Sequence, residues 1–367
     1  MGSILCSRIE DIIFFSDYNF YYDSIKNKKY NAFIDPYFEY FSKKKNCLKL
    51  EILPHFVSLK KDRFFEPVYI KLLYINLIGY IFYKIKKIFL IRNDEFYSNL
   101  SKIISQKCKF EINKNLLESK YNEIYFNSKN IEKILKVIRP KVVFLTCYYN
   151  TMSLSIILAC KNLNIKTVDL QHGGIEPIHL MYRYWQKSEH KNGYKLLPNF
   201  FYLWQKEQLA DSFYKKNSNH KLIEGGKIWL NKVDEILLKK KYLNNYEHIF
   251  FKSLKKYKRT ILFCATDQFP ECLLKAIKIS QNNKNWLWLI RLHPRIGRIK
   301  LLKEKLEELK ISMDNIKIEE PTSVNLFSLI TQVSHVIVEQ SSVAFDAAYY
   351  NKPVICLSNQ PRLFQTW

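Results

Sequence analysis

A histidine and two glycines follow a strand-like segment near the middle of the chain. Residues 166–170 form a short β-branched run suited to a buried strand, and Gln171, His172, Gly173 and Gly174 come directly after it. In open parallel sheets ligands bind beyond the carboxyl ends of the strands, where a histidine can act as a general base or contact a phosphate or oxyanion. Two glycines would let backbone or ligand come close. The alternative is a tight turn made by the glycines and capped by His172.

A basic cluster ends a second strand-like segment, residues 286–292. Arg291, His293 and Arg295 would present positive donors to a phosphate at the edge of a sheet. Pro294 would fix the turn and end the strand. The alternative is a solvated basic loop.

A serine pair begins a helix-like segment near the end of the chain. The strand-like residues 335–339 lead through Gln340 into Ser341 and Ser342. Hydroxyls and N–H groups at a helix N-terminus form an anion site, although a serine there is also a preferred N-cap. Asp346 lies one turn after Ser342 on the same helix face, so its carboxylate could accept hydrogen bonds from ribose hydroxyls.

Strand-like and helix-like segments alternate beyond the N-terminal region. This alternation, in two series, predicts an α/β fold of two Rossmann-like domains that face each other across a cleft. The expected domains are residues 1–245 and 246–367. Within the first, residues 1–135 look helical and are rich in aromatic residues and Lys, whereas residues 139–245 look Rossmann-like. The strand-like segments are residues 141–146, 166–170, 200–204, 221–224, 260–264, 286–292, 316–318, 335–339 and 353–357.

Glycine is scarce, with 8 in 367 residues, and half of the glycines stand in two pairs. One pair is Gly173 and Gly174, and the other is Gly225 and Gly226, directly after the strand-like residues 221–224. The pairs predict a sheet edge at which the backbone must come close to a substrate in the cleft.

The chain is strongly basic, with 59 Lys and Arg against 34 Asp and Glu and a formal charge of +25. Such a charge is compatible with an anionic partner such as nucleic acid, an acidic membrane or a phosphorylated substrate. The lysines are spread along the chain, however, and the joint abundance of Lys, Asn, Ile, Phe and Tyr is what an AT-rich genome produces. We therefore expect no nucleic-acid partner.

The cysteines and the N-terminus indicate a cytoplasmic protein. The 8 cysteines are widely spaced and include no C-x-x-C pair, which favours buried thiols over disulfides or a zinc site. The N-terminal residues place acids among apolar residues and make a poor signal peptide.

The longest apolar stretch, residues 67–91, is too short to span a bilayer. Its uncharged centre, residues 72–83, has about 12 residues where roughly 20 are needed. A core helix is favoured. The alternative is a helix lying on an anionic membrane surface, which would place the protein peripherally at the inner face of the cytoplasmic membrane.

Several motifs with known chemistry do not occur in the sequence. It contains no G-x-G-x-x-G, G-x-x-x-x-G-K-[ST], H-E-x-x-H or G-x-S-x-G, so dinucleotide oxidoreductase, P-loop NTPase, zincin and hydrolase functions are not indicated. It also contains no D-x-D. A metal-bridged diphosphate is therefore not indicated, and we expect no metal.

Four segments resemble the GT-B glycosyltransferases of bacterial surface polysaccharides, with Q-H-G in the first domain and H-P then S-S in the second. They are TVDLQHGG (residues 167–174), LIEGG (222–226), LIRLHPR (289–295) and HVIVEQSSVAFDAAYYNKPVI (335–355). The resemblance spans residues 139–357 and is greatest to proteins of capsule and O-antigen synthesis.

The resemblance implies a nucleotide donor bound by the C-terminal domain. By this likeness His293, Ser341 and Ser342 contact the donor phosphates, and Asp346 contacts the ribose. The N-terminal domain holds the acceptor. His172 is the candidate base or acceptor-side catalytic group, with Gln171 beside it as a further candidate catalytic residue.

The H-P and S-S pair is similar to that of polysialyltransferases and Kdo transferases, which use CMP-sugars. The resemblance thus implies a CMP-sugar donor as co-substrate, without a further cofactor. The acceptor would be a glycan or lipid-linked glycan of capsule, O-antigen or lipopolysaccharide.

The sequence departs from the family pattern at two places. Asp346-Ala-Ala stands where Glu-Ala-Leu is usual, and Asn351-Lys-Pro353 where Gly-x-Pro is usual. The chain also ends about ten residues after its last strand-like segment, from which we expect a shortened donor domain.

Three alternatives stay open at this point. One is a CDP-glycerol-type glycerophosphotransferase, which has related motifs. Another is a nucleotide-sugar epimerase of the same fold, which would need no acceptor. Outside enzymes, a basic protein that binds nucleic acid or membrane would explain the charge alone.

Overall fold

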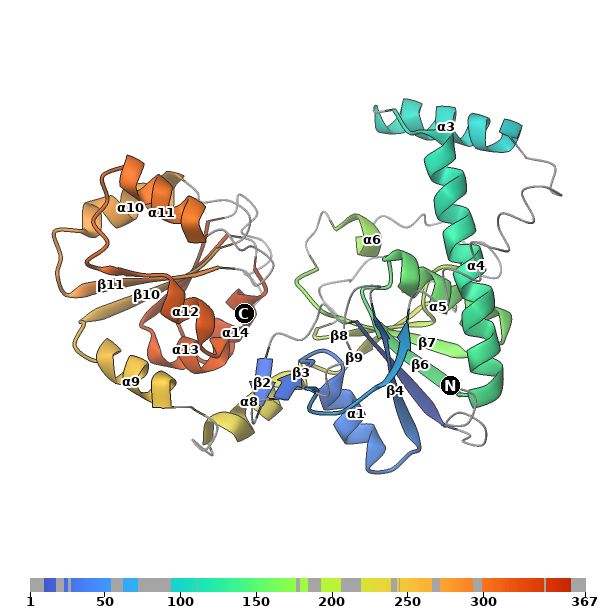
Figure 1. The fold of residues 1–367 in the computed structure, drawn as a ribbon, viewed down its shortest axis with the longest axis horizontal. Coiled ribbons are helices and arrows are strands. Elements are labelled where there is room, and N and C mark those ends of the chain that lie inside the picture. The colour runs from blue at the N-terminus through green and yellow to red at the C-terminus, as the bar shows by residue number, and fades with distance from the viewer. Residues whose placement is uncertain are drawn as a thin grey trace. The chain divides into compact units, whose positions relative to one another are not determined.

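The computed structural model of the chain (Figure 1) divides it into two compact units. The first comprises Met1–Tyr22, Asn27–His172 and Ile178–Ile228, and the second Asp23–Lys26, Gly173–Pro177 and Trp229–Trp367. The structure describes residues 10–17, 23–25, 28–53, 62–71, 94–109, 111–175, 179–183, 193–205, 219–238, 243, 245–265, 271–292, 299–339 and 341–357.

The first unit is built on a seven-stranded parallel sheet. The order across the sheet is β5 (Val68–Lys71), β4 (Cys47–Leu53), β1 (Ile12–Asp17), β6 (Val142–Thr146), β7 (Lys166–Leu170), β8 (Phe200–Leu203) and β9 (Lys221–Glu224). The chain thus builds outward from β1 in one direction and then outward from β6 in the other.

Helices cover this sheet through apolar side chains. Helix α1 (Asp35–Ser42) covers one face, where Tyr37 joins Phe14 and Phe144 in one core cluster. The long helix α4 (Lys114–Ile138) packs against α5 (Thr151–Asn162), which in turn contacts β6 and β7 (Figure 1). Asn113 and Asn150 begin α4 and α5 as N-caps. Further elements before α8 are α3 (Asp94–Cys108), α6 (Leu180–Arg183), β2 (Asp23–Ile25) and β3 (Lys28–Tyr30).

The expectation that residues 1–135 are helical is wrong for β1, β4 and β5. Residues 12–15 of β1 are two isoleucines and two phenylalanines, all buried, and β1 pairs with both β4 and β6. Pairing in the middle of a sheet overrides a helix-like local pattern, because propensity is weak compared with burial. Val68–Lys71 of the apolar stretch 67–91 is the edge strand β5, and residues 72–91 lie outside the described part of the chain.

The second unit is built on a five-stranded parallel sheet. Its order is β12 (Ile316–Lys317), β11 (Trp286–Leu292), β10 (Arg259–Ala265), β13 (His335–Val338) and β14 (Val354–Cys356). Alternate residues of β10 face two cores, with Ile261 and Phe263 in one and Leu262 and Cys264 in the other. The helices are α8 (Trp229–Leu238), α9 (Asn245–Leu254), α10 (Glu271–Ser280), α11 (Ile299–Glu308), α12 (Glu319–Ser323), α13 (Leu326–Gln332) and α14 (Val343–Tyr349).

Helix α8 belongs to the second unit, although it lies before residue 245. The Trp229 ring packs edge-on against Phe327 with centroids 5.7 Å apart. The Asp234 carboxylate accepts hydrogen bonds from the hydroxyls of Tyr349 and Tyr350. In the described part of the chain no helix is both long and apolar enough to cross a membrane.

Candidate functional site

Both sheets have a point at which the strand order reverses. In the first unit this point lies between β1 and β6, and in the second between β10 and β13. In open parallel sheets ligands bind beyond the carboxyl ends of the strands at this switch point. A ligand would therefore meet the residues after β1 and β6 in the first unit and after β10 and β13 in the second, and those after β7 lie next to them at the same sheet edge.

His172 lies two residues beyond the end of β7 and is half-buried. Its Nε2 lies 3.4 Å from the Tyr149 hydroxyl, and its ring meets Phe33 edge-on with centroids 6.3 Å apart. The Nδ1 atom is buried. Nε2 is therefore the nitrogen through which this imidazole could exchange a proton, and the role of general base stays a prediction.

Tyr149 is carried by the turn between β6 and α5. Cys147 in this turn has a left-handed φ of 54°, and the Asn150 side chain accepts from Ser153 N at 2.7 Å to cap α5. Asp169 of the neighbouring strand β7 also holds this turn, because its Oδ1 accepts a hydrogen bond from the Tyr148 N–H at 3.2 Å.

Asp169 is a buried carboxyl within a parallel sheet, 1% exposed. Its Oδ2 accepts from the Tyr182 hydroxyl at 2.7 Å. Burial raises the pKa of Asp169 to about 8. The hydrogen bonds from Tyr182 and Tyr148 lower this pKa, but by less than burial raises it. The carboxyl is therefore mainly protonated at neutral pH and serves to hold two neighbouring groups.

A second histidine lies against the same tyrosines. The His179 ring is 4.8 Å from Tyr182 and 5.6 Å from Tyr149, centroid to centroid. Burial lowers the pKa of His179, so its imidazole is neutral at pH 7. The carboxyl edge of β6 and β7 is thus lined by imidazole and phenol groups.

The turn that carries Phe33 is fixed by buried charges. Asn31 Oδ1 accepts from the Phe33 N–H at 3.1 Å, and the Asn31 N–H donates to Asp35 Oδ2 at 2.9 Å. Asp35 in turn pairs with Lys49 of β4, and both are almost fully buried. Burial raises the pKa of Asp35 to about 6 and lowers that of Lys49. This pair fixes the turn whose Phe33 packs against His172.

Gln171, predicted beside His172 as part of the catalytic group, is 4% exposed. Its Oε1 accepts from the Trp204 N–H at 2.7 Å, and its own N–H donates to the Tyr202 carbonyl at 3.0 Å. The side chain therefore ties the end of β7 to the end of β8.

The two glycine pairs differ in how much space a side chain would have at each position. A Cβ added at Gly225 would lie 1.8 Å from the Tyr202 hydroxyl oxygen, and Gly226 has a left-handed φ of 75°. A Cβ at Gly173 would meet nothing within 4 Å, and one at Gly174 would make an ordinary contact with Phe345 at 3.7 Å. The second pair is thus required by the fold, whereas Gly173 leaves open space.

In the second unit, the serine pair follows β13 at the switch point. Ser341 Oγ accepts from the Val343 N–H at 3.3 Å, while Ser342 makes no capping bond with its side chain. Asp346 is 3% exposed, so its carboxylate does not line an open surface in this structure. Four predicted residues lie outside the described part of the chain: His293, Pro294, Arg295 and Gln340.

Arg291 is used within the second unit. Its NH1 donates to the Pro321 and Val324 carbonyls, the latter at 2.7 Å, and so holds the segment between α12 and α13. Burial raises the pKa of the Cys264 thiol to about 12. The positive charge of Arg291 opposes this increase, and the negative charge of Asp346 adds to it. Both charges thus act electrostatically on a buried thiol of β10.

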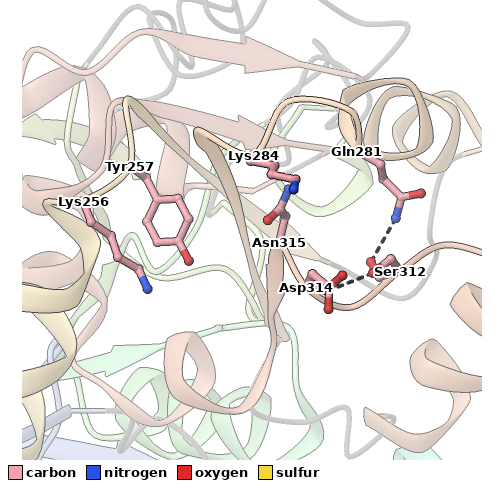
Figure 2. Close-up of a pocket in the computed structure, with 7 residues that line it drawn as sticks. All are labelled: Lys256, Tyr257, Gln281, Lys284, Ser312, Asp314 and Asn315. Atoms are coloured by element: carbon pink, nitrogen blue, oxygen red, sulfur yellow. Dashed lines mark hydrogen bonds between the residues drawn. The ribbon is translucent and has the colours of Figure 1, made fainter.

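A cavity of about 390 Å³ lies elsewhere in the second unit, and Figure 2 shows its lining side chains. The Lys256 ammonium lies 5.1 Å from the centre of the Tyr257 ring, and Gln281 Nε2 donates to the Ser312 carbonyl at 2.9 Å. The lining residues precede β10, β11 and β12, so the cavity is at the amino edge and is distinct from the predicted donor residues. They are Lys256, Tyr257, Gln281, Lys284, Ser312, Asp314 and Asn315.

Three residues of this region, Tyr149, Asp169 and His179, were not predicted from the sequence. Tyr149 follows a strand-like segment as His172 does, so the rule that selected His172 would also have selected Tyr149. Asp169 is an acid within an apolar strand, which signals a buried polar group with a role. His179 has no comparable signal. Among the described residues, no group of three or more His, Cys, Asp and Glu could hold a metal ion.

No protein-family model matches the chain, and no curated protein matches its sequence. Solved structures do match its fold. The UDP-GlcNAc 2-epimerase of Neisseria meningitidis bound to UDP-GlcNAc is 12% identical, with 96% of this chain and 84% of that chain covered and a TM-score of 0.55. The epimerase of Methanocaldococcus jannaschii in complex with UDP-GlcNAc and UDP is 14% identical, with 96% and 85% covered and a TM-score of 0.51.

The wall teichoic acid polymerase TagF is also similar, at 10% identity, with 94% of this chain and 69% of that chain covered. Its TM-score of 0.42 supports no argument about this chain. The likeness to the epimerases confirms the predicted fold class, two parallel-sheet α/β domains of GT-B type. At these identities it shows the fold alone.

Proposed function

We propose that the protein is a glycosyltransferase that moves a sugar from a nucleotide-activated donor to a bacterial surface glycan. The observation that carries this proposal is the half-buried His172 at the carboxyl edge of the first sheet, with Nε2 beside the Tyr149 hydroxyl. A neutral imidazole held there can remove the proton of an acceptor hydroxyl. The GT-B type of fold and the motifs after β7, β11 and β13 support the nucleotide-sugar assignment.

The second unit would bind the donor. Ser341 and Ser342 lie at the switch point between β10 and β13, and His293 follows β11 in the sequence. Groups of this kind would stabilise the charge that develops on the leaving phosphate, an electrostatic contribution of about 3–4 kcal/mol for a single well-placed donor. A CMP-sugar is the donor that the motifs favour.

Nucleotide binding is the first test of this assignment. We would record thermal unfolding of the protein with CMP, CDP, UDP, GDP and their sugars. A ligand at 100 times its Kd stabilises the folded chain by about 2.7 kcal/mol, so a cytidine nucleotide should raise the Tm clearly. His293→Ala should abolish that increase, and equal nucleotide affinity in both proteins would refute the donor-site assignment.

The same experiment separates the alternatives. CDP-glycerol as the best ligand would point to glycerophosphate transfer. No response to any nucleotide, together with a salt-dependent affinity for random DNA, would favour a basic binding protein over an enzyme.

A nucleotide-sugar epimerase is the second candidate, because the GT-B structures similar to this chain include two epimerases with UDP-GlcNAc bound. An epimerase would convert its nucleotide sugar without an acceptor. Incubation of the donor with the protein alone should leave it unchanged if the chain is a transferase. Release of an isomerised or hydrolysed sugar in that reaction would favour the epimerase.

A further inference from the structure

The surroundings of His172 restrict how it can meet an acceptor. Its Nδ1 is buried, and its Nε2 already lies 3.4 Å from the Tyr149 hydroxyl oxygen. A distance of this size is at the long end for a hydrogen bond, as is common at catalytic contacts before the substrate binds. The Tyr149 phenol is thus the polar group that the structure describes next to Nε2.

Tyr149 is held in place from several sides. The adjacent Tyr148 N–H is fixed by Asp169, and the Tyr149 ring packs against the rings of Tyr148, His179 and His172 at 5.5, 5.6 and 6.1 Å between centroids. The residue is nevertheless half-buried, like His172, at the carboxyl edge of β6. A phenol that is fixed in position yet reaches the surface can donate one proton while it accepts another.

We propose that Tyr149 is a catalytic residue that contacts the acceptor hydroxyl and relays its proton to His172. This inference rests on the transfer reaction proposed above. The acceptor oxygen forms a bond to the anomeric carbon, and the bond from that carbon to the donor phosphate oxygen breaks, with the electron pair leaving on the phosphate. The acceptor proton passes to the Tyr149 oxygen, and the phenol proton passes to His172 Nε2. The phenol ends neutral and the imidazole carries the positive charge.

Asp169 has a positioning role in this arrangement. It bonds to the Tyr148 N–H and the Tyr182 hydroxyl, and it reaches neither His172 nor Tyr149 in a described hydrogen bond. Its part is to fix the turn from which Tyr149 projects. Loss of this carboxyl should therefore misplace Tyr149 without removing any reacting atom.

The contact can be tested without a substrate by ¹⁵N NMR of the histidine side chains. The relay requires Nε2 to accept from the phenol, so the neutral His172 imidazole should carry its proton on Nδ1. Tyr149→Phe should shift the His172 Nε2 signal toward the mixture of tautomers of an exposed histidine. The signal is assigned as the one lost in His172→Gln.

Tyr194→Phe is the matched control, since Tyr194 stacks on His220 in the same unit with centroids 6.3 Å apart. It should leave the His172 signal unchanged. An unchanged His172 signal in Tyr149→Phe, or a wild-type Nε2 that carries the proton, would overturn the relay.

Turnover gives the second readout. Tyr149→Phe should lower kcat by about 10²-fold or more, the usual contribution of a proton-transfer group, with the nucleotide Kd unchanged. Tyr194→Phe should retain kcat. Wild-type kcat in Tyr149→Phe would overturn the relay while leaving the transferase assignment standing. No turnover by the wild-type protein with any donor would refute the proposed function and, with it, the relay.

Discussion

The two parallel sheets differ in what they bury. Strands of the first sheet contain Lys49, Glu51 and Asp169, all of them 2% exposed or less. Among the residues of β10–β14, all of which the structure describes, no Asp, Glu, Lys, Arg or His is buried. Burying an ionisable group is costly unless it is paired, so the first sheet carries polar groups that a plain scaffold would not need.

The use of these groups explains the difference. In the first sheet, Asp169 fixes the turn that carries Tyr149, and Lys49 pairs with Asp35 beneath the turn that carries Phe33. Both turns contact His172. In the strands of the second sheet Arg259 is exposed, and Arg291, Lys317 and His335 are half-buried. The first sheet therefore uses buried polar groups to fix the two turns that contact His172, whereas the strands of the second sheet bury no Asp, Glu, Lys, Arg or His side chain.

The largest expected effect concerns the buried pair of the first sheet. Lys49→Met leaves the Asp35 carboxylate buried without its partner and should lower the free energy of unfolding by about 3–5 kcal/mol in urea denaturation. The exposed pair of Lys120 and Glu123 offers the control, because Lys120→Met should cost no more than about 1 kcal/mol. Equal losses in the free energy of unfolding for the two variants would show that the buried pair is no more important for stability than the exposed one.

The next effect is the pH dependence that Asp169 gives to stability. The folded chain holds a proton on Asp169 up to about pH 8, while the unfolded chain releases it near the ordinary pKa of 3.8. The free energy of unfolding should therefore fall as pH rises from 4 to 8, by up to about 1.4 kcal/mol per pH unit from this group. Asp169→Asn cannot titrate and should flatten the profile measured by urea unfolding at pH 5 and pH 8.

Asp11→Asn is the control for this measurement. A hydrogen bond from Lys141 lowers the pKa of Asp11 below 3.8, so this group titrates below pH 4. Its loss should change stability equally at pH 5 and pH 8. Parallel profiles for the wild type and Asp169→Asn would show that Asp169 does not carry the proton.

In the second sheet, substitution of Arg291 tests whether this side chain stabilises the fold or binds phosphate. Arg291→Met leaves the Pro321 and Val324 carbonyls without their donor and should cost about 1–3 kcal/mol of stability. Arg259→Met removes an exposed arginine that stacks on Trp286 and should cost less than about 1 kcal/mol. If Arg291→Met instead keeps its stability but loses nucleotide affinity, Arg291 has the phosphate-binding role expected from the sequence.

The last comparison concerns the stability cost of adding a Cβ to each of the two glycine pairs. Gly225→Ala brings a Cβ against the Tyr202 hydroxyl and should destabilise the first unit by about 1–3 kcal/mol. Gly173→Ala has open space around its Cβ and should leave the Tm unchanged or slightly raised. A larger loss of Tm for Gly173→Ala than for Gly225→Ala would reverse this assignment.

The sequence predicts the strands well in the region where strand-like and helix-like segments alternate regularly. The segment 166–170 coincides with β7, and 141–146 and 260–264 match β6 and β10 to within a residue at each end. It fails for β4, because Lys49 and Glu51 interrupt the apolar pattern. Their partners Asp35 and Arg63 are distant in sequence, so local patterning cannot show that these charges are buried.

The site is predictable to a similar extent. Topology alone places His172 at a sheet edge, since a residue after a buried parallel strand must lie there. The structural roles of Gln171 and Arg291 could not be predicted, because their side chains form hydrogen bonds with backbone groups about 30 residues away. The same holds for Asp169, whose partners Tyr148 and Tyr182 come from two other segments. Residue type indicates chemistry, but tertiary contacts decide whether the group is available for it.

The central proposal is that His172 takes part in sugar transfer, whereas nucleotide binding belongs to the second unit. Its most direct test is to measure nucleotide Kd and transfer rate together in His172→Ala, with His335→Ala of the second sheet as the control histidine. We predict that His172→Ala lowers transfer by about 10²-fold or more and keeps the wild-type Kd, while His335→Ala keeps both. Wild-type transfer in His172→Ala, or loss of nucleotide binding in it, would contradict the claim.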